Sequence, residues 1–333
     1  MIKIEPDFYS RFSCTAQRCT DNCCIGWEID IDENTLEKYK NTDGDIKARL
    51  EKNISFEGTP SFILDENERC PFLNGSNLCD LIISLGEDCL CDICREHPRF
   101  YEWYGDYTDC GLGLCCEEAC RLLFSSEEPL KYIKSSYDKA EENDIDKSSA
   151  ERIFEIRETL FEKINSRNSG SLLQRIKDCC DYVGTVQKSF ACNKPCTAEE
   201  LEKTVTEIMR LSEPFDQHFT DFVSSFSFKK LKDRSDISEN DLERLFSYFV
   251  FRHFVKAVYD NDYITHFKLC LLLFVLALLY LKANESLSKE EAVKYVSKEF
   301  EYSDSNTELL EFECADNRRL SFENLISLTE YLL

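Results

Sequence analysis

The chain has 333 residues, long enough for two or three domains, and its 43% hydrophobic and 31% charged content is typical of a folded protein. It carries 64 acidic and 40 basic side chains, a formal net charge of −24. Such a surface repels phosphate groups and anionic lipid, so the composition argues against nucleic-acid and membrane-surface partners.

The N-terminal third predicts short elements separated by turns. A helix is expected over 32–41, because Asp32 or Asn34 can cap its first turn. Two hairpins are expected where apolar or aromatic stretches flank polar turn residues, over 61–73 and 99–108. Another helix is expected to begin at Glu117.

After about residue 145 the apolar side chains recur at helical spacing, as Ile153, Ile156 and Leu160 do. The helices expected on this basis cover 150–165, 171–182, 197–211, 241–259, 263–283, 288–300 and 320–332. The apolar run Leu269–Leu281 is shorter than the roughly 20 residues that span a bilayer, so it predicts a buried core helix.

These patterns predict a mainly α fold. A small, irregular, cysteine-rich metal-binding module with short hairpins is expected over residues 1–125, followed by an all-helical domain over residues 126–333. The polar segment 125–149 is expected to link the two parts.

Cysteine is the unusual residue of this chain. Thirteen of the 19 cysteines precede residue 121. They are Cys14, Cys19, Cys23, Cys24, Cys70, Cys79, Cys89, Cys91, Cys94, Cys110, Cys115, Cys116 and Cys120. Residues 1–11 lack the apolar segment of a secretory signal, so a cytoplasmic location is expected. In that reducing compartment clustered thiols are metal ligands or reactive groups more often than disulfides.

Clustered thiolates suit iron or zinc, because sulfur donates charge well and four thiolates complete a tetrahedral shell. A zinc ribbon uses two Cys-x2-Cys pairs, and only Cys91 and Cys94 form a clear one. The opening Cys14-x4-Cys19-x3-Cys23, joined by single cysteines farther along the chain, is closer to iron–sulfur ligation. An iron–sulfur cluster is therefore the favoured cofactor, and zinc is the alternative.

Signatures of other cofactor sites are missing from the sequence. Gly111 and Gly113 do not continue into a dinucleotide-binding fingerprint, and there is no phosphate-binding loop or nucleophile elbow. The Cys-x3-Cys-x2-Cys triad of radical S-adenosylmethionine enzymes is also absent.

Six motifs occur in order within the first 121 residues. They are Phe-Ser-Cys at 12–14, Cys-Thr-Asp-Asn-Cys-Cys-Ile-Gly-Trp-Glu-Ile at 19–29, Arg-Cys-Pro-Phe-Leu at 69–73, Leu-Cys at 78–79, Leu-Cys-Asp-Ile-Cys-Arg-Glu-His-Pro-Arg-Phe at 90–100 and Cys-Glu-Glu-Ala-Cys-Arg at 116–121. As a set, they resemble the flagellin lysine-N-methylases of flagellated bacteria.

The resemblance implies a protein-lysine N-methyltransferase that moves a methyl group from S-adenosylmethionine to lysine side chains of flagellin and depends on an iron–sulfur cluster, expected to be of the 4Fe–4S type. The implied metal ligands are Cys14, Cys19, Cys23, Cys24, Cys70, Cys79, Cys91 and Cys94. Cys24 is expected to face away from its neighbour Cys23, because adjacent side chains rarely point at one ion.

The methyl donor is a sulfonium cation, which favours an acidic and aromatic pocket. The expected cofactor-binding residues are Trp27, Tyr101 and Trp103, which lie near the cysteines in sequence. No residue is singled out as the catalytic base. Two other functions stay open at this point: an iron–sulfur electron-transfer or redox-sensing protein, and a zinc-stapled interaction module.

Overall fold

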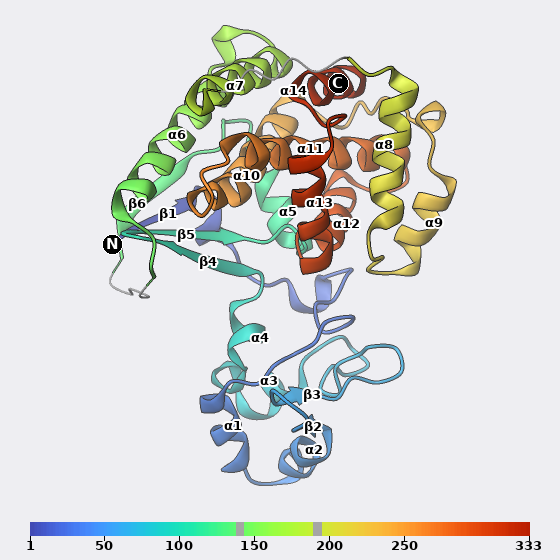
Figure 1. The fold of residues 1–333 in the computed structure, drawn as a ribbon. Coiled ribbons are helices and arrows are strands. Elements are labelled where there is room, and N and C mark those ends of the chain that lie inside the picture. The colour runs from blue at the N-terminus through green and yellow to red at the C-terminus, as the bar shows by residue number, and fades with distance from the viewer. Residues whose placement is uncertain (138–142, 189–194) are drawn as a thin grey trace. The chain divides into compact units, whose positions relative to one another are not determined.

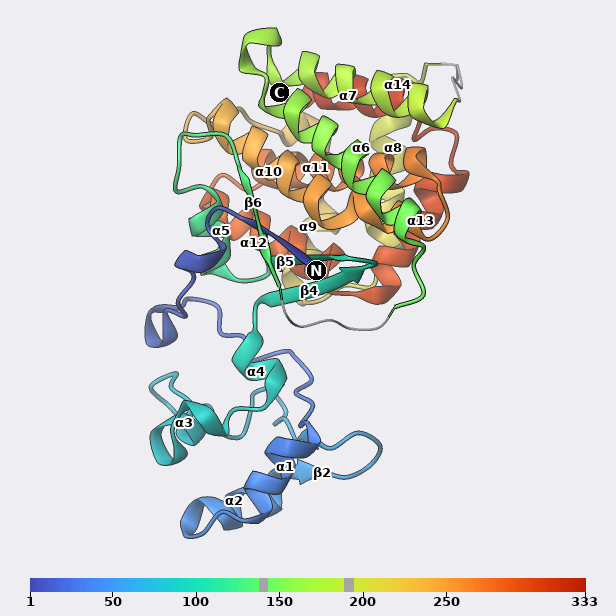
Figure 2. The same cartoon turned by 90° about the vertical axis from the view of Figure 1, so that its left-hand side faces the viewer.

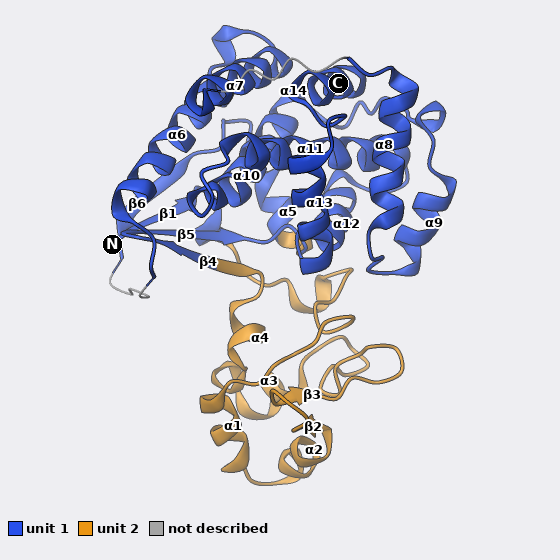
Figure 3. Cartoon of the chain, viewed as in Figure 1, with its two compact units in different colours: residues 1–11, 101–115, 119–333 blue, residues 12–100, 116–118 orange. Residues whose placement is uncertain are grey.

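The computed structural model describes residues 1–137, 143–188 and 195–333. The chain divides into two compact units (Figure 3). Unit 1 comprises residues 1–11, 101–115 and 119–333, and unit 2 comprises residues 12–100 and 116–118. Residues 1–11 and 101–115 group with the helical part of the chain in unit 1. The division into a cysteine-rich domain and a helical domain stays a prediction.

Unit 2 consists of short helices and loops around a small core (Figure 1). Its elements are η2 (Ala16–Arg18), α1 (Glu33–Lys40), α2 (Asp45–Asn53), β2 (Ile54–Ser55), β3 (Ser61–Phe62), α3 (Asp80–Leu85), η3 (Glu87–Cys89) and α4 (Asp92–Glu96). The helix predicted over 32–41 is confirmed as α1, and Asp32 is its N-cap.

The hairpin predicted over 61–73 is wrong, because β3 pairs with β2. The side chain of Asp65 accepts hydrogen bonds from the backbone N–H groups of Asn67 (2.8 Å) and Arg69 (3.0 Å). After this turn the chain pairs with the segment around Ile25, with which Arg69 forms an isolated antiparallel bridge. The change of partner brings the segments around Cys24 and Cys70 together.

Unit 1 contains a four-stranded mixed sheet in the order β4-β5-β1-β6 (Figure 2). The strands are β1 (Ile2–Pro6), β4 (Arg99–Tyr104, which begins in unit 2), β5 (Tyr107–Leu112) and β6 (Tyr132–Ser136). β1 runs parallel to β5 and antiparallel to β6. Adjacent strands β4 and β5 confirm the hairpin predicted over 99–108.

The segment 125–149 is not a plain linker, because it contains β6. The Tyr132 ring stacks on Phe161 and Phe251, with ring centroids 4.1 and 4.8 Å apart, and its hydroxyl donates to the carbonyl of Ser247 at 2.8 Å. This aromatic anchor holds an otherwise polar stretch against the sheet and the helices. Residues 138–142 of the expected linker lie outside the described residues.

Helices make up the rest of unit 1. They are α5 (Glu117–Leu123, which begins in unit 2), α6 (Lys147–Asn165), α7 (Leu172–Gln187), α8 (Ala198–Leu211), α9 (Gln217–Ser225), α10 (Glu239–His253), η6 (Phe254–Val258), α11 (Tyr263–Ala283), α12 (Lys289–Phe300), α13 (Asp304–Asp316) and α14 (Phe322–Leu332). Beyond Ser136, the elements assigned within the described ranges are all helical. The predicted mainly helical fold is confirmed.

Helix α11 forms the centre of this helical layer, where α7, α10, α12, α13 and α14 pack around it (Figures 1 and 2). By length and composition it could cross a membrane, but 89% of its most apolar window is buried inside the protein. Leu269–Leu281 lies within this helix and is buried throughout, which confirms the predicted core helix.

A buried ion pair joins the sheet to the helices. Arg157 on α6 donates through both terminal nitrogens to Asp109 on β5, with Nη2 and Oδ1 2.8 Å apart, and also donates to the carbonyl of Phe251 at 3.0 Å. Both charged side chains are almost fully buried. Burial raises the pKa of Asp109, although the Arg157 guanidinium opposes the shift.

Glu299 on α12 is a buried carboxyl group whose protonation should make the stability of the protein depend on pH. It is 1% exposed and accepts hydrogen bonds from the backbone N–H of Phe215 (3.0 Å) and from Asn306 (3.3 Å). Burial, aided by the nearby Asp216 carboxylate, outweighs these bonds and raises the pKa of Glu299 to about 7. The folded state therefore keeps a proton that the unfolded chain releases near pH 4.5.

Stability attributable to Glu299 should therefore fall as the pH rises from about 4.5 to 7. We expect Glu299→Gln to cancel about 3 kcal/mol of that loss, since one pKa unit corresponds to about 1.36 kcal/mol. Urea unfolding at pH 5 and pH 8 measures the effect. An identical change between the two pH values in both proteins would contradict this account.

Candidate metal centre

Six cysteine side chains from three segments of unit 2 share one neighbourhood. They are Cys23, Cys24, Cys70, Cys79, Cys91 and Cys94. Cys70 and Cys91 are buried in the small core, against which Cys24, Cys79 and Cys94 pack. The charges of these thiols influence one another: the pKa of Cys24 is raised by Cys23, Cys70 and Cys79 as well as by burial. Residues 70 positions apart in the chain thus face a common site.

Backbone pairing explains how these segments meet. The N–H of Cys70 donates to the carbonyl of Cys24 at 2.8 Å, beside the Ile25–Arg69 bridge. A second bridge joins Leu73 to Cys79. Backbone hydrogen bonds therefore connect the segments that carry Cys24, Cys70 and Cys79.

Two of the thiols lie at the N-terminus of a helix. Cys79 is the N-cap of α3, and Cys91 is the N-cap of α4. The backbone N–H groups of Leu81 and Ile82 lower the pKa of Cys79, although burial outweighs them and leaves it raised. A helix N-terminus and its free N–H groups favour a thiolate, which is the form of cysteine that binds metal.

Cys91 and Cys94 act as a pair. A hydrogen bond between their side chains is the largest cause that lowers the pKa of Cys91, and the same bond raises the pKa of Cys94. The hydrogen bond therefore shifts the pKa values of the two thiols in opposite directions. The Cys70 sulfur accepts hydrogen bonds from the backbone N–H groups of Phe72 and Leu73, but burial still raises its pKa to about 11.

The side chain of Asp32 holds the Cys91 segment against α1. Its Oδ1 caps the helix by accepting the N–H of Thr35, and its Oδ2 accepts the N–H of Asp92, each at 2.9 Å. Burial raises the pKa of Asp32, but the hydrogen bonds from Asp92 and Thr35 together outweigh it and leave the pKa lowered. One carboxylate thus fixes both the start of α1 and the start of α4.

The donor set fits a soft or borderline metal, because it consists of reduced sulfur in an apolar core. All eighteen cysteines in the described parts of the chain are free thiols. Within residues 1–137, 143–188 and 195–333, no three Cys, His, Asp or Glu side chains converge on a point that would hold one ion. The six thiols therefore form an open neighbourhood, and not a closed shell for a single ion.

Two of the expected ligands lie on the loop that carries η2. The Cys19 Sγ donates to the carbonyl of Asp21 at 2.9 Å and lies near Cys23, whereas Cys14 is exposed and accepts the N–H of Ala16 at 3.4 Å. The expectation that Cys24 faces away from its neighbour Cys23 is wrong, because the two side chains share a hydrogen bond.

Sequence reasoning missed two residues near these thiols. Cys89 is 7% exposed and its charge interacts with Cys79 and Cys91, so its spacing of two from Cys91 is a signal that could have found it. Glu117 accepts hydrogen bonds from the N–H (3.0 Å) and hydroxyl (2.6 Å) of Thr20, beside Cys19. A separation of 97 residues leaves no local signal for that contact.

The expected cofactor-binding aromatics are divided between the units. Trp27 belongs to unit 2, where its ring lies 6.5 Å from that of His97. Tyr101 and Trp103 belong to unit 1, stack with centroids 6.2 Å apart, and Tyr101 shares a 3.1 Å hydroxyl hydrogen bond with Tyr9. Their role in cofactor binding stays a prediction.

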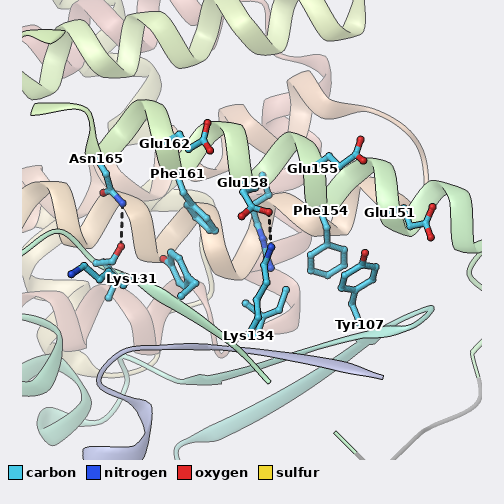
Figure 4. Close-up of a pocket in the computed structure, with 14 residues that line it drawn as sticks. Tyr107, Lys131, Lys134, Glu151, Phe154, Glu155, Glu158, Phe161, Glu162 and Asn165 are labelled. Atoms are coloured by element: carbon cyan, nitrogen blue, oxygen red, sulfur yellow. Dashed lines mark hydrogen bonds and ion pairs between the residues drawn. The ribbon is translucent and has the colours of Figure 1, made fainter. Parts of the chain in front are cut away.

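An acidic and aromatic groove of about 510 Å³ lies in unit 1 between α6 and the sheet (Figure 4). Its aromatic lining comprises two stacked pairs, Tyr107 with Phe154 and Tyr132 with Phe161. Its acidic lining comes from α6 and comprises Glu151, Glu155, Glu158 and Glu162. Lys131, Lys134 and Arg157 also line the groove, and Lys134 pairs with Glu158 at 2.6 Å, so part of its acidic charge is already compensated. Trp27, Tyr101 and Trp103 are not among its residues.

Together, the helical fold and the thiol neighbourhood define a cysteine-rich protein with a candidate metal site. Comparison with curated proteins finds a lysine-N-methylase of Salmonella typhimurium LT2 and one of Salmonella choleraesuis, each 31% identical over 137 residues, which is 38% of this chain and 33% of the relative. The flagellar biosynthetic protein FliU of Salmonella muenchen is also 31% identical over 137 residues, covering 79% of that protein.

The chain belongs to the family of these lysine-N-methylases and FliU. The matched region spans about a third of the length of the two lysine-N-methylases. No protein-family model matches the chain. No solved structure gives a significant match.

Proposed function

We propose that this protein transfers a methyl group from S-adenosylmethionine to lysine side chains of flagellin, and that the transfer depends on an iron–sulfur cluster bound in unit 2. The observation that carries the cluster is that Cys24, Cys70, Cys79, Cys91 and Cys94 meet at one core, with Cys23 hydrogen-bonded to Cys24. Kinship with lysine-N-methylases supports the reaction, and kinship with a flagellar biosynthetic protein supports the substrate.

The cluster ligands would come from the shared neighbourhood, with Cys70, Cys79 and Cys91 as the thiolates that backbone N–H groups stabilise. A bound cluster, which we expect to be of the 4Fe–4S type, would supply redox-active iron coordinated by soft sulfur ligands. Zinc is the alternative metal for the same thiols. We place the protein in the cytoplasm, where a reducing environment keeps such thiols available.

Methyl transfer to lysine sets requirements on the protein. The ammonium group must lose its proton before the nitrogen can attack the methyl carbon, so the site must desolvate the amine or offer a base. The sulfonium donor is a cation, and acidic and aromatic side chains stabilise it. The groove along α6 offers both kinds of side chain.

Mass spectrometry tests the proposed reaction. The protein is purified anaerobically and incubated with flagellin and S-adenosylmethionine that carries a deuterated methyl group. We expect labelled methyl groups on lysine-containing flagellin peptides, and none when the donor is omitted. Absence of label with an iron-loaded protein would contradict the methylase and favour an electron-transfer or redox-sensing role. A colourless, zinc-containing and inactive protein would favour an interaction module.

A further inference from the structure

Tyr39 is the only tyrosine between residues 12 and 100. It lies on α1, is 3% exposed and packs its ring against Phe62, with centroids 6.1 Å apart. Its hydroxyl is buried and has no hydrogen-bond partner in the described structure. A buried hydroxyl without a partner is destabilising, so its retention in a small core requires an explanation.

The surroundings of this hydroxyl are the thiols of the candidate metal centre. Tyr39 belongs to the same core as Cys70, Cys89 and Cys91. The phenol interacts electrostatically with Cys91, Cys89, Cys94 and Cys79, so its hydroxyl lies near these thiols. A phenol is protonated at neutral pH and is therefore a hydrogen-bond donor.

Two contacts hold Tyr39 in this position. At the start of α1, Asp32 accepts the backbone N–H of Asp92, which ties the helix to the Cys91 segment. Near its end, Lys38 donates to the carbonyl of Asp88 at 3.0 Å, and α1 packs on η3. Helix α1, which carries Tyr39, therefore contacts the chain both before Cys89, at Asp88, and after it, at Asp92.

We propose that the Tyr39 hydroxyl donates a hydrogen bond to a sulfur of the bound iron–sulfur cluster, either a cysteine thiolate or a sulfide, and thereby raises the reduction potential of the cluster. This inference rests on the cluster of the proposed function. Reduction adds negative charge to the sulfurs, so a donor stabilises the reduced state more than the oxidised state.

Tyr39→Phe removes the donor and keeps the ring. We expect the reduction potential of the anaerobic, iron-loaded variant to be more negative than that of the wild type, and iron release to a chelator to be several-fold faster. Tyr280→Phe is the matched control: it removes a hydroxyl in unit 1 that hydrogen-bonds to His218 at 2.8 Å, and it should leave the potential unchanged.

A purely structural role for Tyr39 makes a different prediction. If the hydroxyl never meets the cluster, Tyr39→Phe should leave the potential and the iron-release rate at wild-type values, and that result would overturn the inference alone. A wild-type protein that binds no iron would overturn the cluster of the proposed function and this inference with it.

A second variant keeps the test decisive if Tyr39→Phe does not load iron. Incorporation of 3-fluorotyrosine at position 39 makes the phenol more acidic and a stronger donor with almost no change in size. The potential should then shift in the positive direction. An unchanged potential in this variant would also overturn the inference.

Discussion

Replacing Cys91 with alanine should abolish iron binding and lower lysine methylation at least 100-fold. Cys91 is fully buried, is the N-cap of α4, and has a pKa that its hydrogen bond with Cys94 lowers. Removing it also takes away the partner that shares a proton with Cys94. Iron content by absorption spectroscopy and methyl transfer by mass spectrometry measure the two effects on the same sample.

The matched control is Cys180→Ala. Cys180 is 3% exposed and lies on α7 in unit 1, so this variant also removes a buried sulfur from a core. It should lose stability but keep its iron and its activity. Cys91→Ala with wild-type iron content would show that the thiols of unit 2 are not the ligands.

Replacing Arg157 with leucine should lower the free energy of unfolding by about 3–5 kcal/mol, because the buried Asp109 loses the partner of its charge. The guanidinium also lies 4.6–5.5 Å from the ring centroids of Phe154, Phe161 and Phe251. Urea denaturation monitored by circular dichroism measures the loss. Iron bound by unit 2 should be retained, since the pair lies entirely in unit 1.

The double variant Asp109→Asn with Arg157→Leu serves as the control for charge. It removes both members of the pair, so it should recover a large part of the lost stability. If the double variant is no more stable than Arg157→Leu, the lost aromatic and carbonyl contacts of Arg157 would account for the effect, and not the unpaired carboxylate.

Long helices were predictable because their buried side chains recur at the helical period and therefore lie on one face. Ile153, Ile156 and Leu160 are all buried on α6, as their spacing indicated. The cap of α1 was also readable, since Asp32 is followed by a helical pattern. Both features depend on neighbours within a few residues in the chain, which a sequence displays directly.

Contacts between distant segments were harder to predict. Strand β6 is polar in sequence and exists because Tyr132 finds an aromatic stack supplied by α6 and α10. The pairing of β3 with β2 depends on a turn made by a single Asp65 side chain. Such choices are made by tertiary contacts, and local propensity does not encode them.

In the candidate metal centre, too, the local features were predictable and the contacts between distant segments were not. The cysteine spacing indicated a metal-binding region, but it did not show that Cys24 faces the shared core or that Cys89 lies beside Cys91 and Cys79. The buried hydroxyl of Tyr39 carries no motif at all. Its importance follows only from the finding that α1 packs on the segment that leads to Cys91.

The central claim is that lysine methylation depends on an iron–sulfur cluster held by unit 2. The most direct test removes iron from the purified protein, restores it in graded amounts under anaerobic conditions, and measures bound iron, sulfide and flagellin methylation in each sample. We expect methylation to rise in proportion to bound cluster and to be absent in the iron-free protein. Full methylation by the iron-free protein would contradict the claim.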